Sequence, residues 1–398
     1  MNTVKLSEWK YFKKYNNYDY ELPEYETDGE TLKIKYNKDG WICAQFDKKT
    51  TDVEPGKVYK ISYNLKTDSD FVRFIFGWYG KDGKVLEKGY LGKSGGSIIA
   101  PGDACELVLT LRFGSFGQNE AEVSDVSVEC SGDYIPKNVK LATVAIPNIY
   151  FPESQPPEYN LRETIKVIDR LCQREKPDII ALTETFYTRK TLWPLPEMCN
   201  TLDCEAIDVI KKKAKQYNTY IAFSFHEVDD GHFYNSGILI DRKGEIVGKC
   251  HKCHLTMSEY ESGMTPGKEI KVFDTEIGKI GIAICWDIFF PECIREMQKQ
   301  GVDIIINPTA GYKYERINQR CQESGAYIVT SVAANFDKSG IFNPLGEMLV
   351  NAGDNYGYAI AEVDITKPKH MFYLSYGTYT APKNIYLNEA RFDLYGQV

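Results

Sequence analysis

The sequence lacks a long apolar run. No stretch of its 398 residues approaches the roughly 20 consecutive apolar residues that a membrane-spanning helix needs. Residues 1–10 also lack the apolar stretch of a signal peptide. We therefore expect a cytoplasmic protein with no membrane partner. The eleven cysteines of such a chain are expected to be reduced thiols rather than a disulfide framework.

A basic block is missing too. The chain carries 48 lysine and arginine residues against 56 aspartate and glutamate residues, which gives a formal net charge of −8. Nucleic acid binding needs a concentrated positive surface, so no nucleic acid partner is expected. The sequence has no internal repeat and no low-complexity tract. Its length allows more than one domain, at least one of them with a large apolar core.

The first 135 residues lack a long helical pattern. Apolar and polar residues alternate there, as in half-buried strands, at 32–36, 59–65, 107–111 and 123–128. The segment 81–84 supplies a hairpin turn. Short strands separated by turns predict an antiparallel, jelly-roll-like β-sandwich domain over residues 1–135. Residues 130–138 have the composition of a linker.

Two interpretations fit the aromatic residues of this first domain, among them Trp9, Trp41, Trp78 and Tyr79. If they are exposed, they can bind a glycan or a protein ligand. If they are buried, they fill the core of the sandwich, and the domain only packs on its neighbour. We favour the core interpretation because aromatic residues are ordinary core residues in sandwiches.

After the linker the pattern changes to alternating strands and helices. Residues 139–146 predict a strand, and apolar residues at helical spacing follow at 161, 165, 168 and 171. A second helix is expected from Ala206 and a further strand over 220–225. This alternation predicts an α/β domain over residues 138–398.

Cys285 stands at a predicted junction between a strand and a helix. Residues 280–284 are an apolar run that predicts a buried strand, and the segment after Pro291 predicts a helix. A cysteine at such a turn presents its sulfur, while backbone N–H groups there can face a developing oxyanion. The alternative is a buried cysteine that acts as a small hydrophobe. Cys285 is therefore a candidate nucleophile that needs partners elsewhere in the chain.

Two charged residues are candidate partners. Glu184 ends the predicted strand that begins at Asp178, and Lys252 lies on a loop between Glu184 and Cys285. With this Glu–Lys–Cys order the chain resembles the nitrilase superfamily of carbon–nitrogen hydrolases. Further family elements follow in the expected order at 234–236, 265–267, 307–310 and 388–396. The resemblance covers about residues 138–396.

This resemblance implies a fold and a reaction. The fold is a four-layer α-β-β-α sandwich, usually dimerised through its helical face, so a homodimer or higher homo-oligomer is expected. Cys285 is expected to attack an amide carbonyl and form a thioester, with Glu184 as general base. Lys252 and the backbone N–H of Trp286 are expected to stabilise the oxyanion. Because a thiol has an ordinary pKa near ~8.5, a neighbouring cation or base is expected to favour the thiolate.

A second glutamate that orients the lysine is also implied by the family. Glu259 and Glu261 compete for this role, and we prefer Glu259, although the spacing fits neither perfectly. The other of the two is expected to be an exposed loop carboxylate. Candidate substrate-binding residues are Trp286, Phe289, Thr309 and Tyr312.

A short motif around the lysine suggests a different chemistry. Residues 250–254 match the C-x-x-C-H pattern of covalent haem attachment and could be half of a zinc site. The chain shows no export signal, however, and no second C-x-x-C or H-x-x-x-H pair that would complete a zinc site. The family interpretation explains the same residues within a larger pattern. We therefore expect no metal and no cofactor, and we expect His254 to be a hydrogen-bonding residue near the site.

The residues after the cysteine bear on the substrate. Cys285-Trp286-Asp287 is similar to the amidase and carbamoylase branches, whereas nitrilases that act on nitriles commonly have glutamate as the third residue. Members that act on α-keto-dicarboxylic amides place an arginine, which can pair with a carboxylate, where this chain has Phe289. An aromatic residue there resembles N-carbamoylputrescine amidase-like enzymes. It suits a neutral or cationic amide or ureido compound.

The expected function is thus cleavage of a non-peptide C–N bond in a small amide or N-carbamoyl compound, with release of ammonia or an amine. Three alternatives remain open. The enzyme could hydrolyse nitriles, it could pass the acyl group to an amine, or the chain could be a non-catalytic scaffold.

Overall fold

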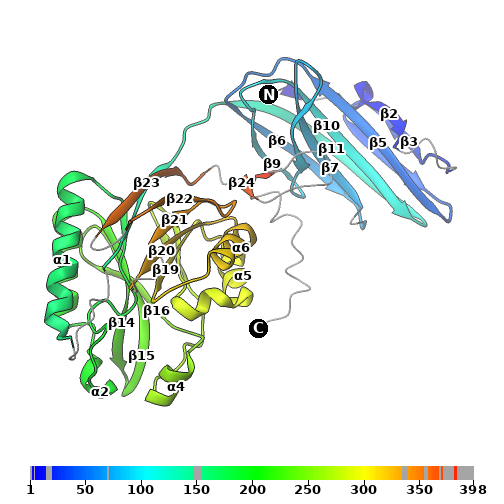
Figure 1. The fold of residues 1–398 in the computed structure, drawn as a ribbon. Coiled ribbons are helices and arrows are strands. Elements are labelled where there is room, and N and C mark those ends of the chain that lie inside the picture. The colour runs from blue at the N-terminus through cyan, green and yellow to red at the C-terminus, as the bar shows by residue number, and fades with distance from the viewer. Residues whose placement is uncertain are drawn as a thin grey trace. The chain divides into compact units, whose positions relative to one another are not determined.

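The computed structural model describes residues 2–3, 5–14, 20–69, 71–146, 155–333, 339–353, 357–366, 369–370 and 381–382. The family element expected at 388–396 lies outside these residues. Up to His370, the chain divides into two compact units, with a boundary between Ile135 and Pro136 (Figure 1).

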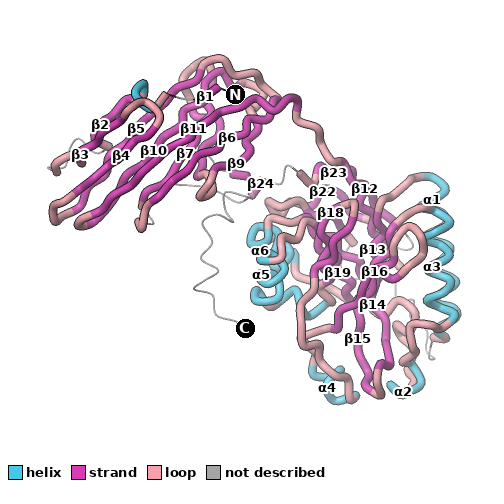
Figure 2. Tube along the Cα trace, turned by 180° about the vertical axis from the view of Figure 1, so that it is seen from behind, coloured by secondary structure: helices cyan, strands magenta, loops and turns pink. Residues whose placement is uncertain are grey.

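The first unit is built from two antiparallel sheets (Figure 2). One sheet has the order β3-β4-β11-β6-β9, with β1 paired to β11. Its strands are β1 (Asn2–Thr3), β3 (Glu24–Thr27), β4 (Thr31–Tyr36), β6 (Lys57–Lys66), β9 (Gly95–Ile99) and β11 (Asn119–Asp133). The other sheet has the order β2-β5-β10-β7-β8. Its strands are β2 (Lys10–Lys13), β5 (Trp41–Thr50), β7 (Val72–Gly80), β8 (Val85–Tyr90) and β10 (Ala104–Phe116), and a 3₁₀ turn precedes them at Leu6–Glu8.

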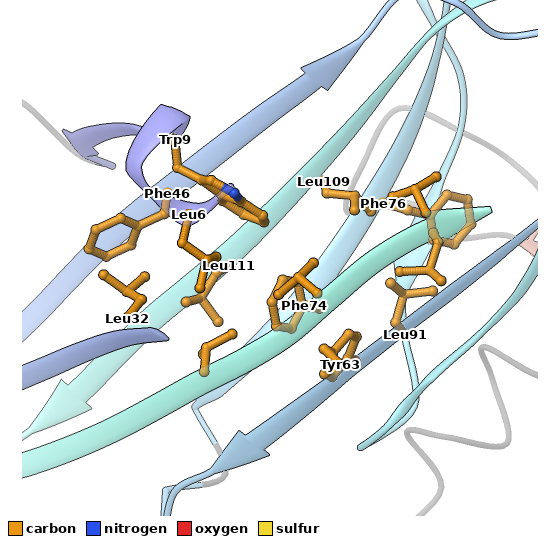
Figure 3. Packing of buried hydrophobic residues seen from close by; sticks show 14 of the residues in the cluster. Leu6, Trp9, Leu32, Phe46, Tyr63, Phe74, Phe76, Leu91, Leu109 and Leu111 are labelled. Atoms are coloured by element: carbon orange, nitrogen blue, oxygen red, sulfur yellow. The ribbon is translucent and has the colours of Figure 1, made fainter. Parts of the chain in front are cut away.

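Alternation along the strands places apolar side chains between these two sheets. In β4, Leu32 and Ile34 are buried while Lys33 and Lys35 are exposed, as the strand period of two requires. Leu32 packs in one apolar cluster with Phe46 of β5 and with residues of both sheets (Figure 3). The alternating pattern therefore describes a shared core between two sheets.

The aromatic residues of this unit do not all behave alike. Trp78 is completely buried, and its ring packs edge-on against that of Tyr59, with 5.4 Å between the ring centroids. Trp9 also belongs to the core cluster (Figure 3). Trp41, in contrast, is 42% exposed, and Tyr79 is half-buried. The core interpretation thus holds for Trp9 and Trp78 but does not describe Trp41.

The linker is shorter than the expected segment 130–138. Strand β11 continues to Asp133, where it still pairs with Lys57 of β6, and the next strand begins at Asn138. Gly132 has a φ of +106° and sits at a register shift within the strand pair, so this glycine forms a bulge and not a turn. The expected start of the linker was therefore wrong, and residues 134–137 join the two units.

The second unit contains two mixed sheets. The first has the order β16-β15-β14-β13-β12-β23, with β12, β13 and β14 parallel. Its strands are β12 (Asn138–Val144), β13 (Ile179–Ala181), β14 (Tyr220–Asp229), β15 (His232–Ile240), β16 (Ile246–His251) and β23 (Tyr358–Asp364). The second has the order β17-β18-β19-β20-β21-β22, with β18, β19 and β20 parallel. Its strands are β17 (Val272–Thr275), β18 (Gly278–Ile282), β19 (Ile304–Thr309), β20 (Tyr327–Val332), β21 (Gly340–Phe342) and β22 (Met348–Asn351). The described elements also include the short strands β24 (Lys369–His370) and β25 (Ala381–Pro382).

Helices accompany these sheets. They are α1 (Pro157–Arg174), α2 (Leu195–Met198), α3 (Glu205–Tyr217), α4 (Met257–Ser262), α5 (Pro291–Lys299) and α6 (Tyr314–Ser324), with a 3₁₀ turn at Cys285–Phe289. The helices expected near 161–171, after Ala206 and after Pro291 are α1, α3 and α5. Within the described part of the chain, no helix combines the length and the apolar character needed to cross a membrane.

Apolar clusters define how the layers of the second unit pack. Leu239 of the first sheet and Ile304 of the second belong to one cluster, so the two sheets face each other. Leu171 of α1 packs with residues of α3 and of the first sheet. Ile294 of α5 packs with Ile317 of α6 and with the second sheet. Accordingly, α1 and α3 lie on one side of the sheets, and α5 and α6 lie on the other (Figure 2).

Candidate active site

Lys252 is a buried cation between two carboxylates. It directly follows β16, and its backbone N–H donates to the carbonyl of Asn235 on β15 at 2.8 Å. The side chain is 1% exposed. Its Nζ lies 3.1 Å from Oε1 of Glu184 and 2.9 Å from both carboxylate oxygens of Glu259. A buried ammonium requires this kind of pairing, because an unpaired one would carry a large desolvation cost.

Asn235 connects the two carboxylates. Its Nδ2 donates to Oε1 of Glu184 and to Oε1 of Glu259, each at 3.1 Å. The residue is 1% exposed, and a buried amide needs such partners. Asn235 stands in the family element at 234–236, but the sequence pattern alone assigned it no role. The available signal was its place on the strand that pairs with the one leading to Lys252.

A capping box explains why Glu259 and not Glu261 reaches the lysine. Thr256 caps α4, and Glu259 occupies the third helical position. The backbone N–H and the hydroxyl of Thr256 donate to Oε2 of Glu259 at 2.8 and 2.9 Å, which turns the carboxylate back over the start of the helix. Lys252 lies there, whereas Glu261 is exposed. The T-x-x-E spacing was visible in the sequence and could have separated the two candidates.

The pairing stabilises the charges of the cluster. Burial disfavours the Lys252 cation, but Glu184, Cys285 and Glu259 together outweigh this effect and raise the lysine pKa above its ordinary value. Burial likewise disfavours the Glu259 carboxylate, yet the charge of Lys252 holds the pKa of Glu259 below its ordinary value. Lys252 and Glu259 therefore stay charged around neutral pH.

Cys285 opens the 3₁₀ turn that follows β18. Its φ of +43° lies in the left-handed region, which is rare for a residue with a Cβ. Thr185, next to Glu184, also has a positive φ, of +41°. Such backbone conformations cost about 1–3 kcal/mol each and cluster at functional sites. The strain at both residues is thus consistent with a site whose geometry the surrounding structure imposes.

The Cys285 thiol has a pKa above its ordinary value. Burial raises its pKa to about 12, and the Glu184 carboxylate contributes to the rise. The Lys252 cation and hydrogen bonds from the Thr309 side chain and the Ala310 backbone act in the opposite direction without cancelling it. The Lys252 cation favours the thiolate, as expected, but burial and the Glu184 carboxylate outweigh its effect. The arrangement instead suits a base that removes the proton as the sulfur attacks.

This raised pKa makes a prediction about alkylation. Because the protonated form is favoured up to about pH 12, the thiolate fraction should increase roughly tenfold per pH unit between pH 7 and 9. The rate of iodoacetamide modification of Cys285, followed by peptide mass spectrometry, should increase in the same way. A plateau reached below about pH 8 would contradict the prediction and indicate a resting thiolate.

Of the four candidate substrate-binding residues, two form an aromatic pair and the other two are buried. Trp286 is 39% exposed, and its ring centroid is 4.7 Å from that of Phe289, so the two form an aromatic pair. Thr309, at the end of β19, is buried, and its hydroxyl donates to the carbonyl of Gly311 at 2.6 Å. Tyr312 is 7% exposed and packs in the core around α5 and α6.

The residues of the C-x-x-C-H segment bind other protein groups. The Cys250 thiol donates to a carbonyl of β18 at 3.7 Å, and the Cys253 thiol donates to the carbonyl of His251 at 3.6 Å. Nδ1 of His254 lies 2.9 Å from Oδ1 of Asp287. His254 is thus a hydrogen-bonding residue that joins the loop of Lys252 to the turn of Cys285.

Solved structures of hydrolases share this fold. Nit3 from Saccharomyces cerevisiae, a member of branch 10 of the nitrilase superfamily, aligns with a TM-score of 0.51 at 20% identity, over 57% of this chain and 90% of that one. An amidase from Nesterenkonia sp. aligns with a TM-score of 0.51 at 17% identity, over 65% of this chain and 95% of that one. These likenesses define the fold as that of the nitrilase superfamily.

The sequence comparisons agree with the fold. The family model for carbon-nitrogen hydrolases matches residues 140–367, and the chain belongs to this family. Omega-amidase NIT2-A from Xenopus laevis is 28% identical over 231 residues, 52% of this chain and 83% of the relative. N-carbamoylputrescine amidase from Solanum tuberosum is 31% identical over 191 residues, 39% of this chain and 63% of the relative. The protein is therefore an enzyme that hydrolyses C–N bonds other than peptide bonds.

Proposed function

We propose that the protein is a thiol amidohydrolase that cleaves a small amide or N-carbamoyl compound through a thioester on Cys285. The observation that carries the proposal is the contact of Lys252 with both Glu184 and Glu259, in a cluster whose charges act on the Cys285 thiol. A base, a cation and a nucleophile held together are the components that acyl transfer needs.

The proposed reaction begins with attack of the sulfur on the substrate carbonyl. Glu184 accepts the thiol proton during this attack, because the thiol is not ionised beforehand. Lys252 and the backbone N–H of Trp286 stabilise the tetrahedral oxyanion. The C–N bond then breaks, and Glu184 passes its proton to the departing nitrogen. Glu184 next takes a proton from water as the hydroxide attacks the thioester carbonyl. The C–S bond then breaks, Glu184 returns this proton to the sulfur, and the acid is released.

The substrate class is inferred from the aromatic pair beside the nucleophile. Trp286 and Phe289 offer an apolar surface and no cation for a substrate carboxylate. This favours a neutral or cationic amide or ureido substrate over the dicarboxylic amides. The named activities of the relatives, omega-amidase and N-carbamoylputrescine amidase, both concern C–N bonds. Nitrile hydrolysis and acyl transfer to an amine remain the alternative reactions, while membership of an enzyme family speaks against a scaffold.

A substrate panel tests this proposal. Neutral, cationic and dicarboxylic amides, N-carbamoyl amines and nitriles should be compared at equal concentration by ammonia release. Amides or N-carbamoyl amines should give the highest kcat/KM, and intact mass should detect an acyl adduct that peptide mapping places on Cys285. Faster turnover of nitriles than of every amide would contradict the proposed reaction.

The architecture of each of the two domains, the oligomeric state and the location of the protein in the cell are also proposals. We propose an accessory β-sandwich domain over residues 1–135 with a jelly-roll-like arrangement and an exposed aromatic surface at Trp41 for a glycan or protein ligand. We propose a hydrolase domain over residues 138–398 with four α-β-β-α layers, supported by the apolar clusters between its sheets and helices. A homodimer or higher homo-oligomer and a cytoplasmic location complete the proposal.

The two glutamates of α4 provide a matched pair of variants. Glu259→Gln should lower kcat by about a hundredfold, because Lys252 loses one of its two charged partners and the orientation that this partner imposes. Glu261→Gln, two residues away and exposed, should leave kcat within about twofold. Steady-state kinetics on the substrate identified by the panel make the comparison. Equal losses of kcat in both variants would show that Glu259 has no greater role in the reaction than Glu261.

A further inference from the structure

The buried side chain of Arg320 contacts the turn that carries Cys285. Arg320 comes from α6 and is 2% exposed. Its Nε donates to the backbone carbonyl of Ile288 at 2.9 Å, and its Nη2 donates to that of Phe289 at 3.0 Å. These are the last two residues of the 3₁₀ turn. The guanidinium therefore binds the C-terminal end of the 3₁₀ turn, through the backbone carbonyls of its last two residues.

The chemistry of this contact is specific to arginine. Carbonyls at the end of a helical turn have no partner within the turn and carry partial negative charge. A guanidinium presents its donors in a rigid fork, which can bind two neighbouring acceptors at once. The remaining Nη1 of Arg320 donates to Oε2 of Glu323 at 2.5 Å. All three nitrogens of the Arg320 guanidinium thus donate hydrogen bonds, and two of them donate to backbone carbonyls of the 3₁₀ turn that carries Cys285.

The opposite end of the same turn is held by a carboxylate. Oδ2 of Asp287 accepts from the backbone N–H of Ile284 at 3.2 Å, and its Oδ1 accepts from the backbone N–H of His254 at 2.8 Å. Cys285 lies between these anchors with its φ of +43°. A residue in this strained region keeps its conformation only where the surrounding structure imposes it. The turn therefore depends on contacts with the distant residues Arg320 and His254 as well as on its own Asp287.

We propose that Arg320 is a positioning residue for the reaction. It holds the backbone of the nucleophile turn, so that Cys285 keeps its left-handed conformation and the N–H groups of the turn keep their direction toward the substrate oxygen. The inference rests on the proposed role of Cys285 as nucleophile. Arg320 acts through the turn and not through the substrate. Its loss should therefore affect the chemical step more than substrate binding, because donors to an oxyanion matter most in the transition state.

Variants of the full-length enzyme test this inference. Arg320→Lys keeps the cation but lacks the fork that binds both carbonyls, and Arg320→Gln lacks the cation as well. Both should lower kcat by about a hundredfold, the loss expected from a small misplacement of catalytic groups. KM should stay within about threefold, measured at a temperature where circular dichroism finds each variant folded. Arg316→Lys, at an exposed position of the same helix, is the control and should match the wild type.

Glu323→Gln keeps the test decisive if the Arg320 variants do not fold. It removes the carboxylate partner but leaves both carbonyl contacts, so kcat should stay within about threefold. A hundredfold loss in Glu323→Gln, or a folded Arg320→Lys with wild-type kcat, would overturn the inference. A failure of the proposed function would be recognised by a different result, because Cys285→Ala would then remain active.

Discussion

Cys285→Ala is expected to lower kcat by at least about a thousandfold, which corresponds to about 4 kcal/mol of activation free energy. The substitution removes the sulfur, and with it the atom that would carry the thioester. It adds no backbone strain at the φ of +43°, because alanine and cysteine both carry a Cβ. The variant should therefore fold, and the loss should be chemical. Ammonia release and thermal unfolding, measured on the same preparation, separate the two effects.

Cys172→Ala is the matched control for this variant. Cys172 lies half-buried on α1, and burial raises the pKa of its thiol to about 12, as for Cys285. Its removal should leave kcat within about twofold. Activity of Cys285→Ala within about tenfold of the wild type would exclude Cys285 as the nucleophile.

Much of the candidate site could be predicted because its residues sit at the ends of recognisable elements. Glu184 follows a short apolar strand, and Cys285 opens a turn between a buried strand and a helix. Lys252 was found through its order between them, which the family resemblance supplied. The preference for Glu259 over Glu261 could have rested on a local signal, the capping box with Thr256, which was visible in the sequence but was not used.

Other features of the site could not be predicted, because they depend on contacts between distant segments. Asn235 bonds to Glu184 across a separation of 51 residues, and Arg320 bonds to Ile288 across 32. A sequence pattern identifies a polar residue in such a place without naming its partner. The net pKa of Cys285 was not predictable for the same reason: a cation was visible in the sequence, but the depth of burial was not.

The fold was predictable to a similar degree. The alternating pattern at 32–36 identified β4, and helical spacing identified α1. The linker was placed wrongly at its start, because Gly132 and its polar neighbours have the composition of a turn whether they form a turn or a bulge. Only pairing with β6 decides between these conformations, and pairing is a long-range property.

Glu184→Gln should change turnover and thiol reactivity in opposite directions. We expect kcat to fall by at least about a thousandfold, or about 4 kcal/mol, because glutamine has nearly the same shape as glutamate but cannot accept the thiol proton. The Glu184 charge also raises the pKa of Cys285, so its removal should lower that pKa. Alkylation of Cys285 by iodoacetamide at pH 9 should then be faster in the variant than in the wild type.

Glu227→Gln is the control for the opposite changes in turnover and in alkylation that we expect of Glu184→Gln. Glu227 is likewise a buried carboxylate, paired with Lys249 at 2.6 Å, so its substitution imposes a similar cost on folding. Its turnover per folded molecule and its rate of Cys285 alkylation should both stay within a few fold of the wild type. If Glu184→Gln lost turnover and alkylated more slowly, the damage would be structural. Only the combination of slower turnover with faster alkylation identifies Glu184 as the base, because a distorted site would impair both reactions of the same sulfur.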